Sequence, residues 1–454
     1  MPDEIPNQQQ IVRALADYYR CPDEYATFAV GADSIATVDV EELYRHITLA
    51  SVNEELHYDP SVWIDKLRCE RYVEEQSTNV ATRAVKGIAR QTYYLVRPLM
   101  PVSVRKHLQK MHLRGWEQIK FPTWPVDRTV EQIVESLLIT FLKTRDITEI
   151  PFIWFWPEGH NSCVIMTHDV ETISGRDFCS NLMDINDSRE IKSSFQVVPE
   201  ERYGVSAEFL SGIRDRGFEV NVHDLNHDGH LFSDYKTFRN RAKRINQYAK
   251  EYGATGFRSA VLYRNADWLN ELEFSYDMSF PNVAHLDPQR GGCCTIRPFF
   301  IGEVLELPLT ATQDYSLFHV LNDYSLDLWK RQIALIMEKY GLISFIVHPD
   351  YIIEGRARDI YEELLDYLVK LRAQENLWIA LPKEVDFWWR QRSQMKLVDR
   401  HGSWQIEGAG RDRAQLAYAR LDNDRLVYSI PGRTDVDKFD VTRTKVLSSH
   451  DLER

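Results

Sequence analysis

The side chains of this sequence that could carry out chemistry lie in or just after four separate short apolar runs. They are Asp169 and Glu171, His223 and His227, Arg258, and His348. Four runs that each deliver an acid, a base or a cation indicate one shared site. Two neutral imidazoles and one carboxylate can bind Zn²⁺ and leave a position open for water, which is the arrangement of a hydrolytic metal site.

The carboxylates Asp169 and Glu171 are two residues apart. In an extended chain such residues point to the same side, so both can enter one pocket. One of them can bind the metal while the other takes a proton from the attacking water, and the spacing leaves open which does which. Arg258 could hold a carboxylate in place, and His348 could protonate a leaving amine from the opposite side.

The pair His223 and His227 also has the spacing of the H-E-x-x-H helix of zinc proteases. That site needs a continuous helix and a glutamate base. Here Asp224 takes the place of the glutamate, and Asp228-Gly229 interrupts any helix, so the protease is disfavoured. Other nearby candidates are expected to be structural or bystanders: His168, His230, His285, and Asp277 in a turn or helix cap.

Strands are predicted at the short apolar runs 163–166, 193–198, 218–222, 256–259, 304–309, 343–347 and 377–381. Helical stretches lie between several of them. The clearest spans residues 238–253, where one face carries Phe238, Ala242, Ile245, Ala249 and Tyr252, and Gly253 is placed to end the helix. Strands that alternate with helices indicate a parallel sheet or barrel, whose catalytic groups gather at the C-terminal ends of the strands.

Three regions that differ in their residue patterns predict three domains. Residues 1–150 are expected to be mostly helical, with one amphipathic helix over 130–144. Residues 155–390 would form the α/β catalytic domain, and residues 395–454, with alternating apolar positions and turn signals, a small β-rich appendage. The basic segment 97–116 is interpreted as a solvated helix face; contact with an acidic partner or with phospholipid at a membrane surface is the alternative.

The bulk composition excludes several classes of function. The chain has 454 residues and a formal net charge of −13, which argues against binding to nucleic acid. It has no N-terminal basic-then-apolar signal and no apolar stretch long enough to span a bilayer, so a cytoplasmic location is expected. Its six cysteines do not suggest a disulfide scaffold, and Cys293-Cys294 is interpreted as two buried apolar side chains.

The order of these motifs resembles that of the polysaccharide deacetylase family, also called carbohydrate esterase family four or the NodB-like family. "MTHDVE" (166–171) resembles its first motif, "VHDLNH" (222–227) its second, "FRSAVLY" (257–263) its third and "FIVHP" (345–349) its last. The resemblance covers roughly residues 155–385. It implies a distorted (β/α)₇ barrel and the metal-dependent removal of N- or O-acetyl groups from sugars.

Carried over to this sequence, the resemblance implies that Asp169 is the general base and that Arg258 holds it. His223 and His227 would bind one divalent ion, with Zn²⁺ as the first candidate, and His348 would be the general acid. The usual adjacent Asp-Asp pair is Asp169-Val170-Glu171 here, so Glu171 is assigned as the third ligand, with direct ligation by Asp169 as the alternative.

The sequence therefore predicts a metal-dependent deacetylase that acts on an acetylated sugar, polysaccharide or glycan precursor. Two other functions remain open. One is a degenerate barrel that binds glycans or scaffolds polysaccharide assembly, since the first and third motifs are altered. The other is a hydrolase of the same fold that cleaves a C–N bond in a compound other than a sugar. The sugar, the acyl position and the oligomeric state are left undetermined by the sequence.

Overall fold

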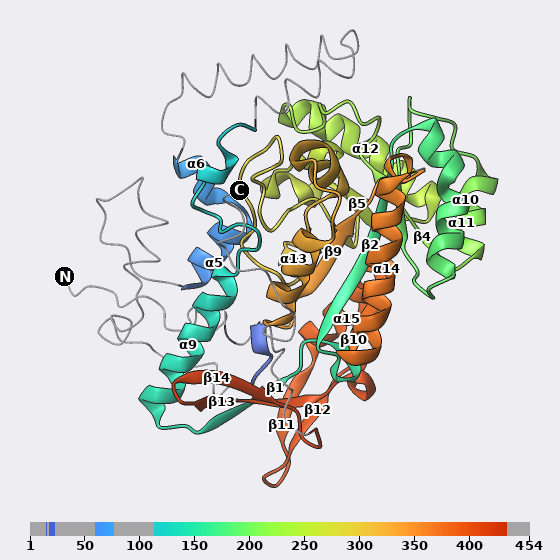
Figure 1. The fold of residues 1–454 in the computed structure, drawn as a ribbon. Coiled ribbons are helices and arrows are strands. Elements are labelled where there is room, and N and C mark those ends of the chain that lie inside the picture. The colour runs from blue at the N-terminus through green and yellow to red at the C-terminus, as the bar shows by residue number, and fades with distance from the viewer. Residues whose placement is uncertain (1–14, 16–17, 23–59, 77–112, 354, 434–454) are drawn as a thin grey trace, which may run out of the picture.

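The computed structural model describes residues 15, 18–22, 60–76, 113–353 and 355–433 (Figure 1). Most of the basic segment 97–116 lies outside these residues, so its expected role stays a prediction. In the part of the chain that is described, no helix is long and apolar enough to cross a membrane.

The centre of the molecule is a nine-stranded sheet. Leaving out the antiparallel edge strand and one additional strand, it consists of parallel strands in the order β9-β2-β3-β4-β5-β6-β8. Their bounds are β2 Ser162–Val170, β3 Ser194–Val197, β4 Glu219–His223, β5 Gly256–Arg258, β6 Tyr276–Asp277, β8 Val304–Glu306 and β9 Leu342–Ile346. All of them except β6 overlap one of the apolar runs that were predicted to be strands.

This sheet curls until its two ends nearly meet. Beyond β8, the backbone N–H of Ala311 donates to the carbonyl oxygen of Ser344 in β9, over 3.1 Å. The additional strand β10 (Leu377–Ala380) pairs with the first part of β2, while β3 pairs with its last part. The edge strand β7 (Phe299–Ile301) forms an antiparallel hairpin with β8. The predicted distorted (β/α)₇ barrel is confirmed by this topology.

Helices cover the outer face of the barrel: α10 (Ile173–Asp187), α11 (Ala207–Asp215), α12 (Tyr235–Tyr252), α13 (Asp327–Met337) and α14 (Arg356–Gln374). Three of them begin at side-chain caps, because Thr172, Ser206 and Asp234 each accept a backbone N–H of the first turn. The predicted helix 238–253 is confirmed as α12, with its apolar face buried and Gly253 in the left-handed conformation at φ 57°. Together with alternate strand residues such as Val164 and Met166, these helices form the outer core.

A second apolar cluster, here called the floor core, closes the barrel at the end where its parallel strands begin. It contains the inward-facing Cys163 and Ile165 of β2, together with Phe152 and Trp154 from the segment before the barrel. Further members come from α9 (Thr129–Arg145) and α15 (Pro382–Gln394). The predicted helix over 130–144 is confirmed as α9, and the apolar face expected from its sequence is buried.

The chain after the barrel is β-rich as far as it is described, to residue 433, with β11 (Lys396–Asp399), β12 (Trp404–Glu407), β13 (Leu416–Asp422) and β14 (Arg425–Ser429). β13 pairs antiparallel with β1 (Glu149–Ile153), which precedes the barrel in the sequence. Figure 1 shows β1, β13 and β14 together at the lower end of the molecule, beside α9. The described part of the N-terminal region also contains α5 (Pro60–Arg68) and α6 (Arg71–Gln76), and the division into three domains stays a prediction.

Candidate metal centre

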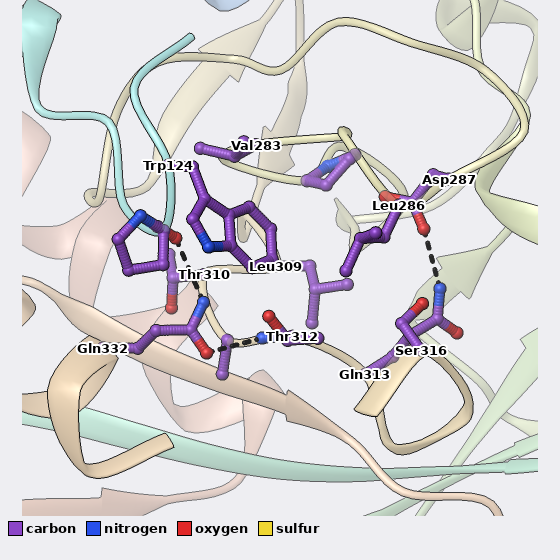
Figure 2. A pocket seen from close by; sticks show the side chains of 13 residues that line it. Trp124, Val283, Leu286, Asp287, Leu309, Thr310, Thr312, Gln313, Ser316 and Gln332 are labelled. Carbon is purple, nitrogen blue, oxygen red and sulfur yellow. Dashed lines mark hydrogen bonds between the residues drawn. The ribbon is translucent and has the colours of Figure 1, made fainter. Parts of the chain in front are cut away.

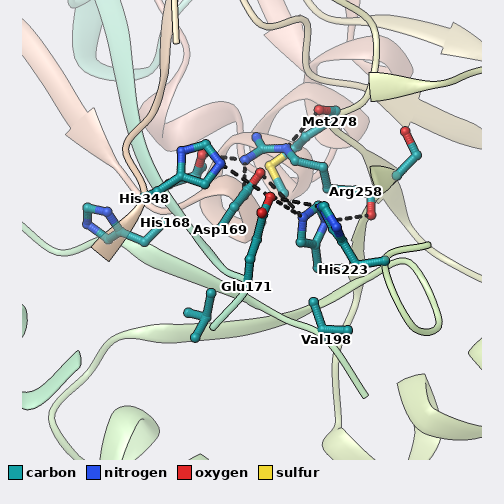
Figure 3. Close-up of polar contacts among 12 residues, drawn as sticks. His168, Asp169, Glu171, Val198, His223, Arg258, Met278 and His348 are labelled. Carbon is teal, nitrogen blue, oxygen red and sulfur yellow. Dashed lines mark hydrogen bonds and ion pairs between the residues drawn. The ribbon is translucent and has the colours of Figure 1, made fainter. Parts of the chain in front are cut away.

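Strands β2, β4 and β5 and the segment after β9 present the candidate residues to the barrel interior. On β2, Cys163 and Ile165 point inward, and Asp169 has the same parity. Glu171 follows just after the strand with this parity again. On β4 and β5, His223 and Arg258 are register partners and therefore share a face. Figure 3 shows Asp169, Glu171, His223, Arg258 and His348 converging on one place.

One oxygen of Glu171 is the common neighbour of three imidazoles. Its Oε1 lies 2.8 Å from Nε2 of His227, 3.5 Å from Nε2 of His223 and 3.3 Å from Nε2 of His348. Among the described residues, Nε2 of His223 and of His227 are buried and make no hydrogen bond of acceptable geometry, despite these short distances. Two imidazole nitrogens directed at one carboxylate without bonding to it fit a divalent cation, so the donor set suits Zn²⁺.

The second nitrogen of each imidazole affects how well it can bind a metal. Nδ1 of His223 donates to the carbonyl oxygen of Arg258 over 3.1 Å, which leaves Nε2 free as a ligand. Nδ1 of His227 lies 3.2 Å from Nη2 of Arg202, a group that can only donate. Ligation through Nε2 of His227 therefore requires Arg202 to turn to its other acceptor, the carbonyl oxygen of His227.

The loop that carries the histidine pair is not a helix. Asp224 and His227 both have φ of 55°, in the left-handed region, and no helix spans residues 224–229. Arg241 holds the loop from α12 through two hydrogen bonds to Asp228, of 2.6 and 2.7 Å. The zinc-protease arrangement, which places both histidines on one helix, is therefore absent at this site.

Asp169 makes different contacts from Glu171. Its Oδ1 accepts a hydrogen bond from Nη1 of Arg258 over 2.7 Å, and the same nitrogen donates to Oγ1 of Thr167 over 2.7 Å. Arg258 is fully buried, and its Nε donates to the carbonyl oxygen of Met278, which fixes the guanidinium. The other oxygen of Asp169 lies 3.7 Å from Nε2 of His223. This oxygen is the one available to accept a proton.

His348 is held from behind by Asp314, a residue that the sequence motifs did not single out. Nδ1 of His348 lies 2.7 Å from Oδ1 of Asp314, and the backbone N–H of His348 donates to Oδ2 over 2.7 Å. Asp314 is completely buried in the loop after β8. These two contacts direct Nε2 of His348 toward Glu171. In the sequence, Asp314 could have been found only as an acidic residue that follows another predicted strand of the barrel.

The charges of the site offset the effect of burial on each pKa. Burial acts to raise the pKa of Glu171, but the facing imidazoles, His227 first, hold it well below its ordinary value. Burial also opposes the charged form of Asp169, and Arg258 outweighs it, so the pKa of this carboxyl is lowered. For His348, burial would lower the pKa, yet the Asp314 carboxylate raises it well above its ordinary value. The site thus contains two carboxylates and a protonated His348 near neutral pH.

The expected bystanders lie elsewhere. His168 points to the outer side of β2, where its Nδ1 donates to the carbonyl oxygen of Val347 over 2.9 Å, and burial lowers its pKa to about 4. Asp277 is buried and accepts a hydrogen bond from Ser279 over 2.7 Å. His285 stacks on Trp124. Cys293 and Cys294 are buried free thiols, as expected.

No protein-family model matches the chain, and no curated protein is found to match it. Solved structures do match. A protein from Mycobacterium smegmatis assigned as a polysaccharide deacetylase is 20% identical with a TM-score of 0.42, over 52% of this chain and 93% of that one. The peptidoglycan deacetylase PdaC from Bacillus subtilis is 13% identical with a TM-score of 0.33, over 51% and 92%.

A third matching structure is the Xyl-CE4 domain of a multidomain xylanase from the hindgut metagenome of Trinervitermes trinervoides. It is 13% identical with a TM-score of 0.31, over 49% of this chain and 89% of that domain. The chain is thus similar, at low identity and over about half of its length, to solved structures of polysaccharide deacetylases and of carbohydrate esterase family four, the family that its sequence motifs resemble.

Proposed function

We propose that this protein is a metal-dependent deacetylase that acts on an acetylated sugar, polysaccharide or glycan precursor. One observation carries the proposal. A candidate ligand group, Glu171 with His223 and His227, lies next to a carboxylate held by an arginine and a histidine held by an aspartate. Metal-assisted hydrolysis of an amide or ester uses these three functions together: a metal site, a proton acceptor and a proton donor.

A divalent ion held by Glu171, His223 and His227 would polarise the acetyl carbonyl and make a water molecule more acidic. Asp169 accepts the proton of the attacking water through the oxygen that Arg258 leaves free. His348 donates its Nε2 proton to the departing amine or alcohol, and Asp314 stabilises the imidazolium beforehand. The Glu171 side chain is 22% exposed, whereas those of Asp169, His223 and His348 are at most 5% exposed, so substrate enters past Glu171.

The metal site can be tested by elemental analysis of the purified protein. We expect about one divalent ion per chain, lost in His223→Ala/His227→Ala and in Glu171→Gln. Asp169→Asn should keep the ion, because the proposal assigns the metal to Glu171, His223 and His227, while Asp169 is bonded to Arg258. His230→Ala, which removes a histidine from the same loop, is the matched control and should also keep it. A wild type without metal would contradict the proposal.

The reaction can be tested by acetate release from N- and O-acetylated oligosaccharides and sugar precursors. Asp169→Asn should lower the rate by roughly 10²–10⁴-fold, the usual contribution of a positioned proton acceptor. The exposed Asp177→Asn on α10 makes the same chemical change at the surface and should leave the rate unchanged. Full acetate release by Asp169→Asn would exclude this residue as the base.

The same assays separate the alternatives. A protein that binds oligosaccharides but releases no acetate would be a degenerate glycan-binding barrel. Release of ammonia or an amine from compounds other than sugars, without acetate, would identify a hydrolase of other C–N bonds. The proposed compartment is the cytoplasm, and cell fractionation with an antibody against the chain tests that location.

A further inference from the structure

The residues that precede the barrel reach its mouth in two places. Trp124 lines a small cavity together with Leu286 and Asp287 of the loop after β6 (Figure 2). Earlier in the chain, the hydroxyl of Tyr72 in α6 donates to the carbonyl oxygen of Gly292, in the same loop, over 2.8 Å. The helix α6 therefore lies against a loop at the end of the barrel that carries the candidate metal centre.

A buried ion pair joins the connection between α5 and α6 to the chain after β5. Both carboxylate oxygens of Glu70 accept hydrogen bonds from Arg264, over 2.7 Å from Nε and 2.5 Å from Nη2. The Arg264 side chain is fully buried, and that of Glu70 is 7% exposed. The third guanidinium nitrogen, Nη1, donates to the carbonyl oxygen of Leu262 over 2.8 Å. Arg264 thus links Glu70 to the turn that follows β5.

The energetics of this ion pair favour a role in positioning. Moving two charges out of water costs about as much free energy as their attraction returns, so apolar side chains of similar size often stabilise a fold equally well. What a guanidinium adds is the fixed direction of its hydrogen bonds. Glu70 and Arg264 therefore matter more for where Leu262 is held than for the stability of the fold.

The turn that Arg264 holds has an unfavourable backbone conformation. Val261 and Leu262 have φ of 59° and 53°, in the left-handed region, which costs free energy for residues other than glycine and most for a β-branched residue such as valine. A backbone hydrogen bond closes the turn, from the N–H of Tyr263 to the carbonyl oxygen of Ala260 over 3.2 Å. Such a turn persists only where its surroundings hold it, and the bond from Arg264 reaches its second strained residue.

The turn directly follows a residue on which the candidate metal centre depends. The carbonyl oxygen of Arg258 accepts Nδ1–H of His223 over 3.1 Å and the backbone N–H of Asp224 over 2.8 Å. The guanidinium of Arg258 holds Asp169. If the turn relaxed, the backbone of Arg258 would shift, and a candidate ligand and the proposed base would shift with it.

We propose that Glu70 is a positioning residue for the reaction, because through Arg264 it holds the turn 259–263 and thereby Arg258 and His223. The inference rests on the proposed function for the roles of Asp169 and His223. It assigns the connection between α5 and α6 to the support of the active site, although these helices lie far before the barrel in the sequence.

The test compares the wild-type full chain with Glu70→Met/Arg264→Met. This double variant removes both charges together, so neither is left buried without a partner, and it should unfold at the wild-type temperature. Amide hydrogen exchange, followed by mass spectrometry, should become about 3–10-fold faster in peptides covering 258–263 and 223–227, the effect of one lost hydrogen bond on local opening. The dissociation constant for Zn²⁺, measured by competition with a chelator, should rise about 10-fold. For acetate release, kcat should fall about 10–100-fold with little change in KM, as for other groups that orient metal ligands.

Arg71→Met is the matched control. Arg71 and Asp267 form an exposed ion pair over 3.1 Å, which joins α6 to the same chain after β5 at the surface of the molecule. Because exposed pairs contribute little, this variant should match the wild type in exchange, Zn²⁺ binding and kcat. Arg264→Lys is a milder second variant, since an ammonium keeps the charge opposite Glu70 but lacks the guanidinium fork. It should change the same three quantities in the same direction, by less.

The positioning role is overturned if the double variant exchanges the two peptides at the wild-type rate, or if its kcat and its Zn²⁺ affinity equal those of the wild type. If the double variant does not fold, Arg264→Lys decides by the same criteria. The two proposals fail in different ways. A wild type that binds no metal and releases no acetate rejects the proposed function, while the exchange rates still decide whether Glu70 holds the turn. Acetate release by the wild type with unchanged exchange in the variants rejects the role of Glu70 alone.

Discussion

At the scale of single residues, the sequence pointed to the candidate groups at the strand ends and to Arg258 as the partner of a carboxylate, but not to Asp314, which holds His348. His348 directly follows an apolar run, so its position was predictable. Asp314 belongs to a loop that continues well beyond β8, and no local pattern connects it with His348. The spacing also left open whether Asp169 or Glu171 faces the metal. In the structure Asp169 is bonded to Arg258 and Glu171 is not, but both carboxylates belong to a candidate metal-binding group, so the assignment of Glu171 as the ligand stays a prediction.

The contact between Asp314 and His348 leads to a prediction for Asp314→Asn. An amide in place of the carboxylate removes the charge that stabilises the protonated imidazole, so less His348 is available as a proton donor. We expect kcat for acetate release to fall by about 10–100-fold, part of the usual contribution of a general acid, while the bound metal is retained. Asp323→Asn, in the same connection before α13, is the control for kcat. An unchanged kcat in Asp314→Asn would show that His348 does not act as the acid.

At the scale of elements, the apolar runs predicted the parallel strands of the barrel except β6, which has only two residues. Such runs predict strands because a parallel strand is buried on both faces and is apolar throughout. The segment "PFIWFW" (151–156) lies outside the predicted strands, whereas its first part belongs to β1. Its partner β13 lies far away in the sequence, and periodicity within one segment contains no information about such a distant partner. Strand pairing of this kind becomes visible only in the assembled fold.

Gly256 in β5 lies where there is no room for a side chain. A Cβ atom on Gly256 would lie 2.3 Å from the ring of Tyr276 in the neighbouring strand. The ring cannot move away easily, because the Tyr276 hydroxyl accepts a hydrogen bond from Asn221 and donates one to Glu219. Gly256→Ala should therefore lower the free energy of unfolding by about 1–3 kcal/mol, measured by denaturant titration.

Gly212 provides the control for this prediction. It lies inside α11, and nothing is within 4 Å of the place where its Cβ would be. Gly212→Ala should raise the stability by about 0.5–1 kcal/mol, because alanine favours the helix. If Gly256→Ala proves as stable as the wild type, the packing of β5 against β6 is looser than the structure has it.

At the scale of the whole molecule, the two apolar cores differ in how far apart their members lie along the sequence. The outer core is built by the barrel strands and the helices between them, which are neighbours along the chain. The floor core joins α9, β1, α15 and the final hairpin, which are distant from one another in the sequence. The side chains of Phe152 and Trp154 are fully buried there. Regions assigned from the sequence to different domains therefore share one apolar cluster.

This shared cluster makes a prediction about the fragment 155–390, the catalytic domain as the sequence delimits it. The fragment keeps Cys163, Ile165 and Trp388 but loses the side chains from α9, β1 and the hairpin that cover them. Removal of a single large buried side chain costs about 3–5 kcal/mol, and whole domains are stable by only about 5–15 kcal/mol. We expect the fragment to aggregate or to unfold without cooperativity, whereas the longer fragment 15–433, which keeps the floor core, stays monomeric and unfolds cooperatively. Gel filtration and thermal unfolding followed by circular dichroism would show this difference. A monomeric, cooperatively unfolding fragment 155–390 would instead establish the barrel as an independent domain, with the floor core as an interface between separate units.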